Sequence, residues 1–401
     1  MNNVSQHDTG TGLLRQFSVQ ASAAGLLAAF VGSASSFAVI IQGLTAVGAS
    51  QIQAASGLMA LCISMGLCAI VVSLKMRQPI SIAWSTPGAA LLAATALPEG
   101  GFATAVGAFL VSGLLIVIAG LWKPLGRAVA AIPAPLANAM LAGVLLGLCL
   151  APVKAVAEAP VYGLAIILTW ALVARFRRLY AVPAAVLVTV IIIAMTADVS
   201  QLHADALWPQ PVLVMPQFSL AGLVGIALPL FIVTMASQNI PGIAVLNVNG
   251  YRPDPGPLFS ITGIFSLAAA PFGGHAVNLA AITAALCAGT DAHPDPTRRY
   301  WAAAMSGVFY ILFGLGAGAA TAFVSAAPPI LIQAVAGLAL FGAFGSALLG
   351  AVTDPTNREA AIITFVVTAS GLSFFGISGA FWGLLAGGAI YALTHWRRKN
   401  A

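Results

Sequence analysis

Residues 78–95 read QPISIAWSTPGAALLAAT, and the interruption inside this apolar stretch decides how the fold is interpreted. Pro87 cannot lie in the middle of a helix without losing a backbone hydrogen bond. Proline is well suited to the first turn of a helix, and Thr86 or Ser85 can cap that turn. We therefore predict that residues 79–85 are extended and that a half-helix begins near Pro87, about halfway between the charged residues on either side.

The composition places this stretch in a membrane. Of 401 residues, 60% are hydrophobic and 6% are charged, and the mean hydropathy is +1.00. A typical soluble domain has about 25% charged residues, so a water-soluble enzyme and a disordered chain are both excluded. The apolar runs are continuous and do not alternate, which indicates an all-α polytopic membrane protein and not a β-barrel.

Neither the net charge nor the cysteines point to a cofactor or to nucleic acid. The net charge is +6, but the basic residues lie in short clusters between apolar runs, as expected of topology signals. The four cysteines all lie inside apolar runs, without the spacing of metal ligands, and we expect them to be buried packing residues. We predict no cofactor and no metal.

The charge-free runs can be converted into membrane crossings, because a helix needs about 20 apolar residues to span the hydrocarbon layer. By length, the first half of the chain holds seven crossings, in the runs 16–74, 78–98, 100–122, 128–153, 159–174 and 179–197. The second half holds seven again, in the runs 206–251, 255–290, 300–353 and 360–396. The sequence thus predicts 14 transmembrane segments.

The distribution of basic residues tests this count. With both termini in the cytoplasm, every Lys and Arg except Lys154 falls on the cytoplasmic side, as the positive-inside rule requires. An error of one crossing in the middle of the chain would destroy this bias. We therefore predict a multi-pass protein of the cytoplasmic (inner) membrane with both termini cytoplasmic.

When a repeat contains an odd number of membrane crossings, its second copy has the opposite orientation in the membrane. Such inverted seven-helix repeats occur in many transporters, which bind substrate at broken helices in matching positions of the two halves. We predict one repeat over residues 1–200 and the other over 201–401, separated by the polar stretch 198–217.

The tenth segment is the predicted partner of the third. Residues 270–283 read APFGGHAVNLAAIT, in which Gly273 and Gly274 permit an irregular backbone. We expect segment 10, like segment 3, to be broken into an extended stretch and a half-helix, which runs from near His275 to Ala288. Two half-helix N-termini would then face each other in the membrane and form an anion site. The alternative is that both interruptions are ordinary kinks.

Several amides lie inside apolar runs and are candidate binding groups. Gln238 and Asn239 end the eighth segment, and Gln42 is their weaker counterpart in the first. They either bind substrate or only bond neighbouring helices.

His275 is the one ionisable residue predicted deep in the membrane, because all acidic residues and the other histidines map to loops or span ends. An intramembrane ionisable group is by default a candidate functional residue, and we expect His275 to couple transport to protons. The alternative is a structural histidine bonded to a carbonyl group.

At these segments the sequence resembles the benzoate–proton symporter family (the BenE type), over nearly the whole chain. The resemblance is carried by residues 237–242 (SQNIPG), 249–251 (NGY), 271–279 (PFGGHAVNL) and 84–88 (WSTPG). It implies the seven-plus-seven fold shared with nucleobase and bicarbonate transporters, with a core domain (segments 1–4 and 8–11) and a gate domain (segments 5–7 and 12–14). It also implies substrate between segments 3 and 10, and a homodimer.

The sequence departs from the nucleobase transporters of this fold at the amides. Those transporters usually carry an acidic residue on segments 8 and 10, where this chain has Gln238, Asn239 and Asn278. A fixed carboxylate would repel an anionic substrate, so the departure favours a carboxylate and weakens a nucleobase interpretation.

We therefore predict a secondary transporter that imports benzoate, or a similar aromatic carboxylate, with a proton. Its candidate substrate-binding residues are Gln42, Trp84, Ser85, Thr86, Pro87, Gly88, Gln238, Asn239, Phe272, Gly273, Gly274, His275 and Asn278. Trp84 and Phe272 are the candidate ring contacts. The alternatives are a nucleobase or other small-anion transporter on the same fold, a channel, and an intramembrane enzyme. The enzyme lacks support because no second catalytic group accompanies His275 in the membrane.

Overall fold

The computed structural model describes residues 18–130, 132–196, 208–280, 282–326, 328–372, 374 and 377–399, which are mostly helical. The polar stretch predicted to separate the two halves lies partly outside these residues. In the first half the elements are α1 (Val19–Ala46), α2 (Gln51–Met76), β1 (Ile82–Trp84), α3 (Thr86–Ala93), α4 (Gly101–Leu121), α5 (Lys123–Ala130), α6 (Ala134–Cys149), α7 (Ala151–Glu158), α8 (Pro160–Arg177) and α9 (Ala181–Thr196).

The second half begins with one helical run that is wound more loosely at two places. This run comprises α10 (Leu220–Gly222), the π-helical turn η5 (Leu223–Ala227), α11 (Leu228–Thr234), the π-helical turn η6 (Met235–Asn239) and α12 (Ile240–Val248). The elements that follow are α13 (Pro255–Ala269), β2 (Val277–Leu279), α14 (Ile282–Ala288), α15 (Tyr300–Leu315), α16 (Ala317–Ala326), α17 (Pro329–Val352), α18 (Arg358–Ala369) and α19 (Gly379–Lys399).

Length and apolarity identify the helices that can cross a membrane. Seven of the described helices meet both criteria, and up to nine do if each of two bent pairs counts as one span. One of these pairs is α15 and α16, which bend by 54° at their junction. Half-helices such as α3 and α14 are too short to cross alone, so the count of 14 segments stays a prediction.

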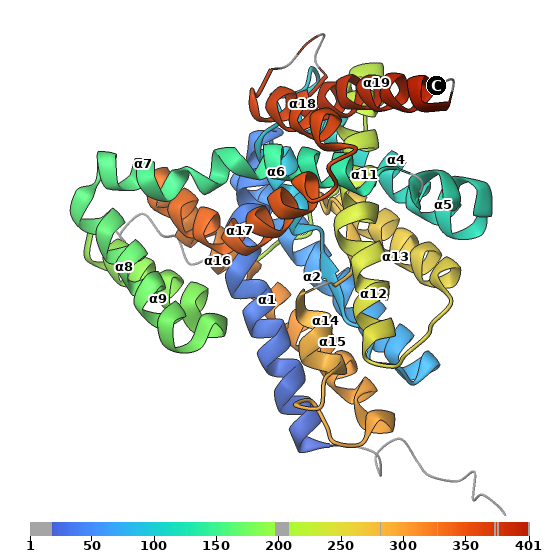
Figure 1. Cartoon of the computed structure of the whole chain (residues 1–401). Coiled ribbons are helices and arrows are strands. Elements are labelled where there is room, and N and C mark those ends of the chain that lie inside the picture. The colour runs from blue at the N-terminus through green and yellow to red at the C-terminus, as the bar shows by residue number, and fades with distance from the viewer. Residues whose placement is uncertain are drawn as a thin grey trace, which may run out of the picture.

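The helices pack in two groups (Figure 1). In the first group, α1 packs on α3 and α15, α2 packs on α15, and α4 packs on α13. In the second, α6 packs on α17 and α18, α18 packs on α19, and α8 packs on α9. Figure 1 shows α8 and α9 on the far side of α1 from α12 and α13. The groups meet where α1 touches α17 and α3 touches α6.

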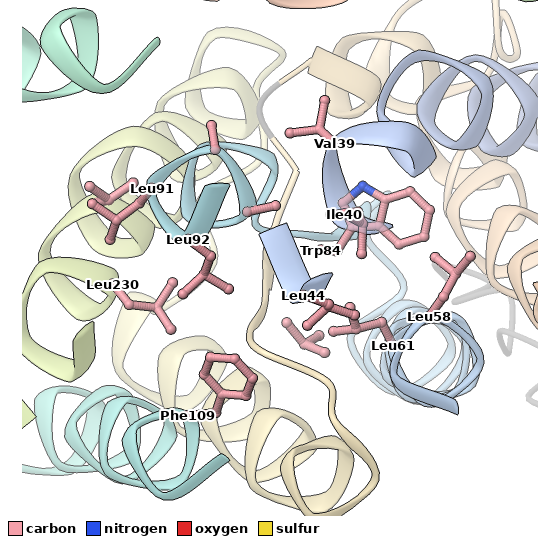
Figure 2. Packing of buried hydrophobic residues seen from close by; sticks show 14 of the residues in the cluster. Val39, Ile40, Leu44, Leu58, Leu61, Trp84, Leu91, Leu92, Phe109 and Leu230 are labelled. Atoms are coloured by element: carbon pink, nitrogen blue, oxygen red, sulfur yellow. The ribbon is translucent and has the colours of Figure 1, made fainter. Parts of the chain in front are cut away.

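The buried core of the first group surrounds β1 and α3 (Figure 2). Leu91 and Leu92 of α3 lie on one side of β1 with Leu230, and Trp84 lies on the other side beside Ile40. Gly43 of α1 makes this packing possible, because a Cβ atom there would overlap the carbonyl oxygen of Ala89 on α3. Close approach of backbones at small residues is typical of helix packing in membranes.

The third segment is broken as predicted. Strand β1 precedes α3, the side chain of Ser85 caps the helix, and Pro87 lies in its first turn.

The tenth segment also has an extended stretch followed by a half-helix, but the prediction that the half-helix begins near His275 is wrong. Gly273, with φ at +93°, ends the turn that follows α13, and residues 277–279 form β2. Helix α14 begins only at Ile282. The backbone of β2 pairs with β1, so a partner distant in the sequence, and not the local sequence, keeps this stretch extended.

Candidate functional site

The centre of the candidate site is the antiparallel pair of β1 and β2. In this pair Ala83 lies opposite Asn278, and Trp84 lies opposite Val277. The pairing continues beyond both strands, because Ser85 N donates to Ala276 O at 3.1 Å and Ala280 N donates to Ser81 O at 2.9 Å. The pair therefore fixes the start of α3 against the segment that contains His275.

Ser85 connects the strand pair to α3. Its hydroxyl accepts a hydrogen bond from Gly88 N at 3.1 Å and another from the Thr234 hydroxyl at 3.0 Å. Pro87 has no N–H group. The first turn of α3 therefore offers fewer free backbone donors to an anion than the sequence suggested.

His275 is fully buried beside Ser85. Its Nε2 lies 2.9 Å from the Ser85 carbonyl oxygen. Because a carbonyl oxygen only accepts, Nε2 carries the proton of this bond. Its Nδ1 is also buried and has no hydrogen-bond partner among the described residues. The ring of Phe109 meets the imidazole at a centroid distance of 6.3 Å.

The two adjacent amides of η6 serve different purposes. The side-chain oxygen of Asn239 accepts from Leu279 N at 2.9 Å, so Asn239 holds β2 in place. Gln238 is also buried, but it lines a cavity. π-Helical turns are frequent at functional sites, and this turn presents one amide to the strand and its neighbour to the cavity.

Asn278 is the third predicted amide and lies on β2 itself. Its side-chain nitrogen donates to the Leu279 carbonyl oxygen at 2.8 Å. Its side-chain oxygen is buried and has no hydrogen-bond partner within the described part of the chain. Asn278 is thus only half satisfied in this structure.

The cavity that Gln238 lines measures about 50 Å³. Its walls are formed by Val31, Gly32, Ser36, Met65, Ala83, Trp84, Thr86, Gln238, Ala280, Thr283 and Tyr310. Ligand pockets usually measure about 300–1,000 Å³, so this cavity is too small to hold a ligand in the conformation of this structure. Trp84 is fixed in its wall, because Nε1 donates to the Ser36 hydroxyl at 2.8 Å.

Not every predicted residue lies at this cavity. Gln42 lines a different and larger pocket. The Phe272 carbonyl oxygen accepts from the Ser56 hydroxyl at 2.9 Å, and Phe272 lies in the short turn that follows α13. Gly273 and Gly274 belong to the same turn, where Gly274 N donates to Ala269 O at 3.0 Å.

Sequence reasoning missed three polar residues of the cavity: Ser36, Thr283 and Tyr310. Thr283 also pairs with the Ser81 hydroxyl at 3.1 Å. Ser and Thr hydroxyls are common in membrane helices and often bond to the backbone one turn earlier, as Ser36 does to the Gly32 carbonyl oxygen, so composition gave no signal for these residues. Within the described residues, no three His, Cys, Asp or Glu side chains are placed to hold a metal ion.

Comparison with protein families matches residues 15–393 to the family described as benzoate membrane transport protein. The chain belongs to this family. Its members are membrane transporters and not enzymes, so this chain is a multi-pass membrane transporter of the benzoate transporter family.

Two curated relatives cover nearly the whole chain. The inner membrane protein YdcO of Escherichia coli (strain K12) is 41% identical over 372 residues, which are 93% of this chain and 95% of that protein. The benzoate membrane transport protein of Acinetobacter baylyi (strain ATCC 33305 / BD413 / ADP1) is 31% identical over 379 residues, 94% of this chain and 96% of that protein.

Solved structures share the fold. The transmembrane domain of the cyanobacterial bicarbonate transporter BicA matches 92% of this chain and 98% of its own, with a TM-score of 0.59 and 14% identity. SLC26A9 matches 95% of this chain and 66% of its own, with a TM-score of 0.60 and 12% identity. These likenesses show that this chain shares its fold with the BicA domain and with SLC26A9.

Proposed function

We propose that this transporter imports benzoate, or a similar aromatic carboxylate, together with a proton across the cytoplasmic membrane. The observation that carries the proposal is the cavity between Gln238 and Thr86, at the start of a half-helix, in a chain of the benzoate transporter family. The identity of 31% to the Acinetobacter baylyi benzoate membrane transport protein supports the substrate, and the name of the YdcO relative supports the inner membrane.

Side chains are the main donors offered to the carboxylate. Ser85 occupies the Gly88 N–H, and Asn239 is bonded to β2. Gln238 and Thr86 line the cavity, and we assign the Gln238 amide and the Thr86 hydroxyl to the carboxylate. The helix dipole of α3 adds a partial positive charge at the same end.

The proton makes import of an anion favourable. Carboxylic acids titrate near pH 4, so the substrate is an anion at neutral pH. An inside-negative membrane opposes its entry by about 2.3 kcal/mol per charge per 100 mV. One accompanying proton removes this opposition and adds the pH gradient.

We assign the proton to His275, whose imidazole titrates near neutrality when unperturbed. His275 does not line the cavity, but its hydrogen bond to Ser85 connects it to the first turn of α3. A proton on Nδ1 would place a positive charge behind the proposed carboxylate site, so that proton and anion favour each other's binding.

We further propose that the chain consists of two inverted seven-helix repeats, residues 1–200 and 201–401, with 14 crossings and both termini cytoplasmic. The antiparallel pair of β1 and β2 supports this, because each strand is followed by a half-helix. The two packing groups support a core domain of segments 1–4 and 8–11 that moves against a gate domain of segments 5–7 and 12–14. The homodimer stays a prediction.

Uptake of labelled benzoate into proteoliposomes, with pH and voltage gradients imposed separately, tests the proposal. We expect accumulation when the outside is acidic and competition by other aromatic carboxylates. Uptake of a labelled nucleobase or of labelled bicarbonate, with no uptake of benzoate, would replace this substrate by another on the same fold.

A further inference from the structure

A second, larger pocket lies where the two packing groups meet. It measures about 550 Å³, which is within the range of ligand pockets. Helices α1 and α3, with α16, which packs mainly on α2, form one wall, and α6 and α17 form the other. Its lining includes Gln42, Thr45, Ala94, Gly147, Ser325 and Gln333.

The lining of this pocket is mostly apolar, with the polar side chains of Gln42, Thr45, Ser325 and Gln333, and carries no charge. Gln42 and Gln333 are its two amides, and none of the lining residues is Asp, Glu, Lys, Arg or His. Neutral dipoles can attract a carboxyl group without holding it as tightly as a buried cation would. A passage site needs this property, because a ligand must both enter it and leave it.

Gln42, which lines the pocket, has one unsatisfied side-chain atom. Its side-chain oxygen is buried and has no hydrogen-bond partner among the described residues. An unsatisfied buried polar group destabilises a protein, unless water or a ligand supplies the missing partner. The atom is an acceptor, so the partner that it lacks is a donor, such as water or the O–H of a protonated carboxyl group.

Every lining element contributes residues from the same end of the molecule. These residues come from the last turns of α1, α3, α6 and α16 and from the first turns of α17. In the proposed topology, all these ends lie on the outer side of the membrane. The small cavity at Gln238 lies deeper, at the start of α3.

We propose that the pocket is the external vestibule of the transporter, in which Gln42 and Gln333 receive the carboxyl group of the aromatic acid before it reaches Gln238. The ligand and the side of the membrane rest on the proposed function. The pocket joins two separately packed groups of helices, so a movement of one group against the other would close it. The structure is then open to the outside and closed at the centre.

Gly147 allows a direct test of accessibility. It is exposed on α6, and a Cβ atom there would meet no heavy atom within 4 Å. The native cysteines are all buried, so the parent protein is a low-background control. We expect a membrane-impermeant thiol reagent to label Gly147→Cys in whole cells but not in inside-out vesicles, and saturating benzoate to slow the labelling.

The results separate the parts of the proposal. Labelling from the inner side, or no labelling from outside, would overturn the external vestibule, and this arm needs no benzoate. Labelling that benzoate does not slow would overturn the aromatic acid as its ligand. Failure of the parent to transport benzoate would instead overturn the proposed function, and leave the accessibility result to stand separately.

The second test obstructs the pocket with a large side chain. Gly147→Phe fills the vestibule without a backbone clash, and Gly388→Phe on α19 is a matched control, because a Cβ atom there also meets no heavy atom within 4 Å. We expect Gly147→Phe to lower benzoate uptake at least about tenfold relative to this control. Equal uptake by the two variants would refute a route through the pocket.

The proposal gives Gln333 a role in binding the carboxyl group of the substrate in the vestibule. Gln333→Leu removes one amide, and we expect the benzoate concentration for half-maximal uptake to rise by about threefold to tenfold, as for loss of one hydrogen bond. Gln333→Asn should recover part of this loss. A merely structural role for Gln333 would lower the yield and the maximal rate, and leave the half-maximal concentration unchanged.

Discussion

Nε2 of His275 donates a hydrogen bond of 2.9 Å to the carbonyl oxygen of Ser85, the residue that caps the half-helix α3. The histidine and the serine are 190 positions apart in the chain. The bond joins the proposed proton site to the proposed anion site through one backbone group. A change in the protonation of the imidazole can therefore affect the start of α3 without contact between His275 and the substrate.

His275→Gln tests the proton site. Glutamine keeps a donor for Ser85 but cannot titrate, so we expect loss of benzoate accumulation driven by a pH gradient, while benzoate binding is partly retained. The pH dependence of binding should flatten, because glutamine has no proton to exchange in this range. Accumulation in proteoliposomes and equilibrium binding measure the two quantities. If the variant still accumulates benzoate against its gradient, His275 is structural.

Gln238→Glu tests the carboxylate site. A buried like charge should weaken benzoate binding more than loss of a hydrogen bond does, because a charge inside the membrane costs about 2.5–3.5 kcal/mol. Gln238→Ala should be milder, at about 0.5–1.5 kcal/mol. Binding measured by calorimetry on the purified protein ranks the two variants. The assignment fails if the Glu variant binds benzoate as tightly as the parent.

Gly88→Val tests the packing of α3. A Cβ atom at Gly88 would lie 2.6 Å from Leu230 Cδ1 and 2.7 Å from the Ser85 hydroxyl. We expect overpacking to lower the free energy of unfolding by about 1–3 kcal/mol, and benzoate binding to fall with it. Gly345→Val is the control, because no heavy atom lies within 4 Å of a Cβ atom there. Equal melting temperatures in detergent would contradict this packing.

Asn239→Leu tests whether Asn239 holds β2. The substitution removes the acceptor of the Leu279 N–H and leaves a buried donor unpaired, at a cost of about 1–3 kcal/mol. We expect a lower melting temperature and faster amide hydrogen exchange at residues 277–279. Asn239→Asp keeps the acceptor and should preserve the slow exchange. Unchanged exchange in the Leu variant would show that β1 alone holds the strand.

The sequence by itself determined the class of protein and the break in the third segment. Charge-free runs report membrane burial directly, because lipid excludes charged side chains. Pro87 and Ser85 act within one helical turn, so the extended stretch and the start of α3 follow from local chemistry. The family resemblance was also carried by short local strings such as residues 271–279, and the family match confirms it.

Only the tertiary structure decided the tenth segment and the fate of each amide. Residues 277–279 are a strand because β1 pairs with them, and no local pattern announces a partner that distant. Asn239 and Gln238 are neighbours of the same chemical type, yet one binds the backbone of β2 and the other faces a cavity. Gln42 lines a different pocket, because that pocket forms where α1 packs against α17. Composition and spacing describe one segment at a time, whereas a cavity is the space left between several.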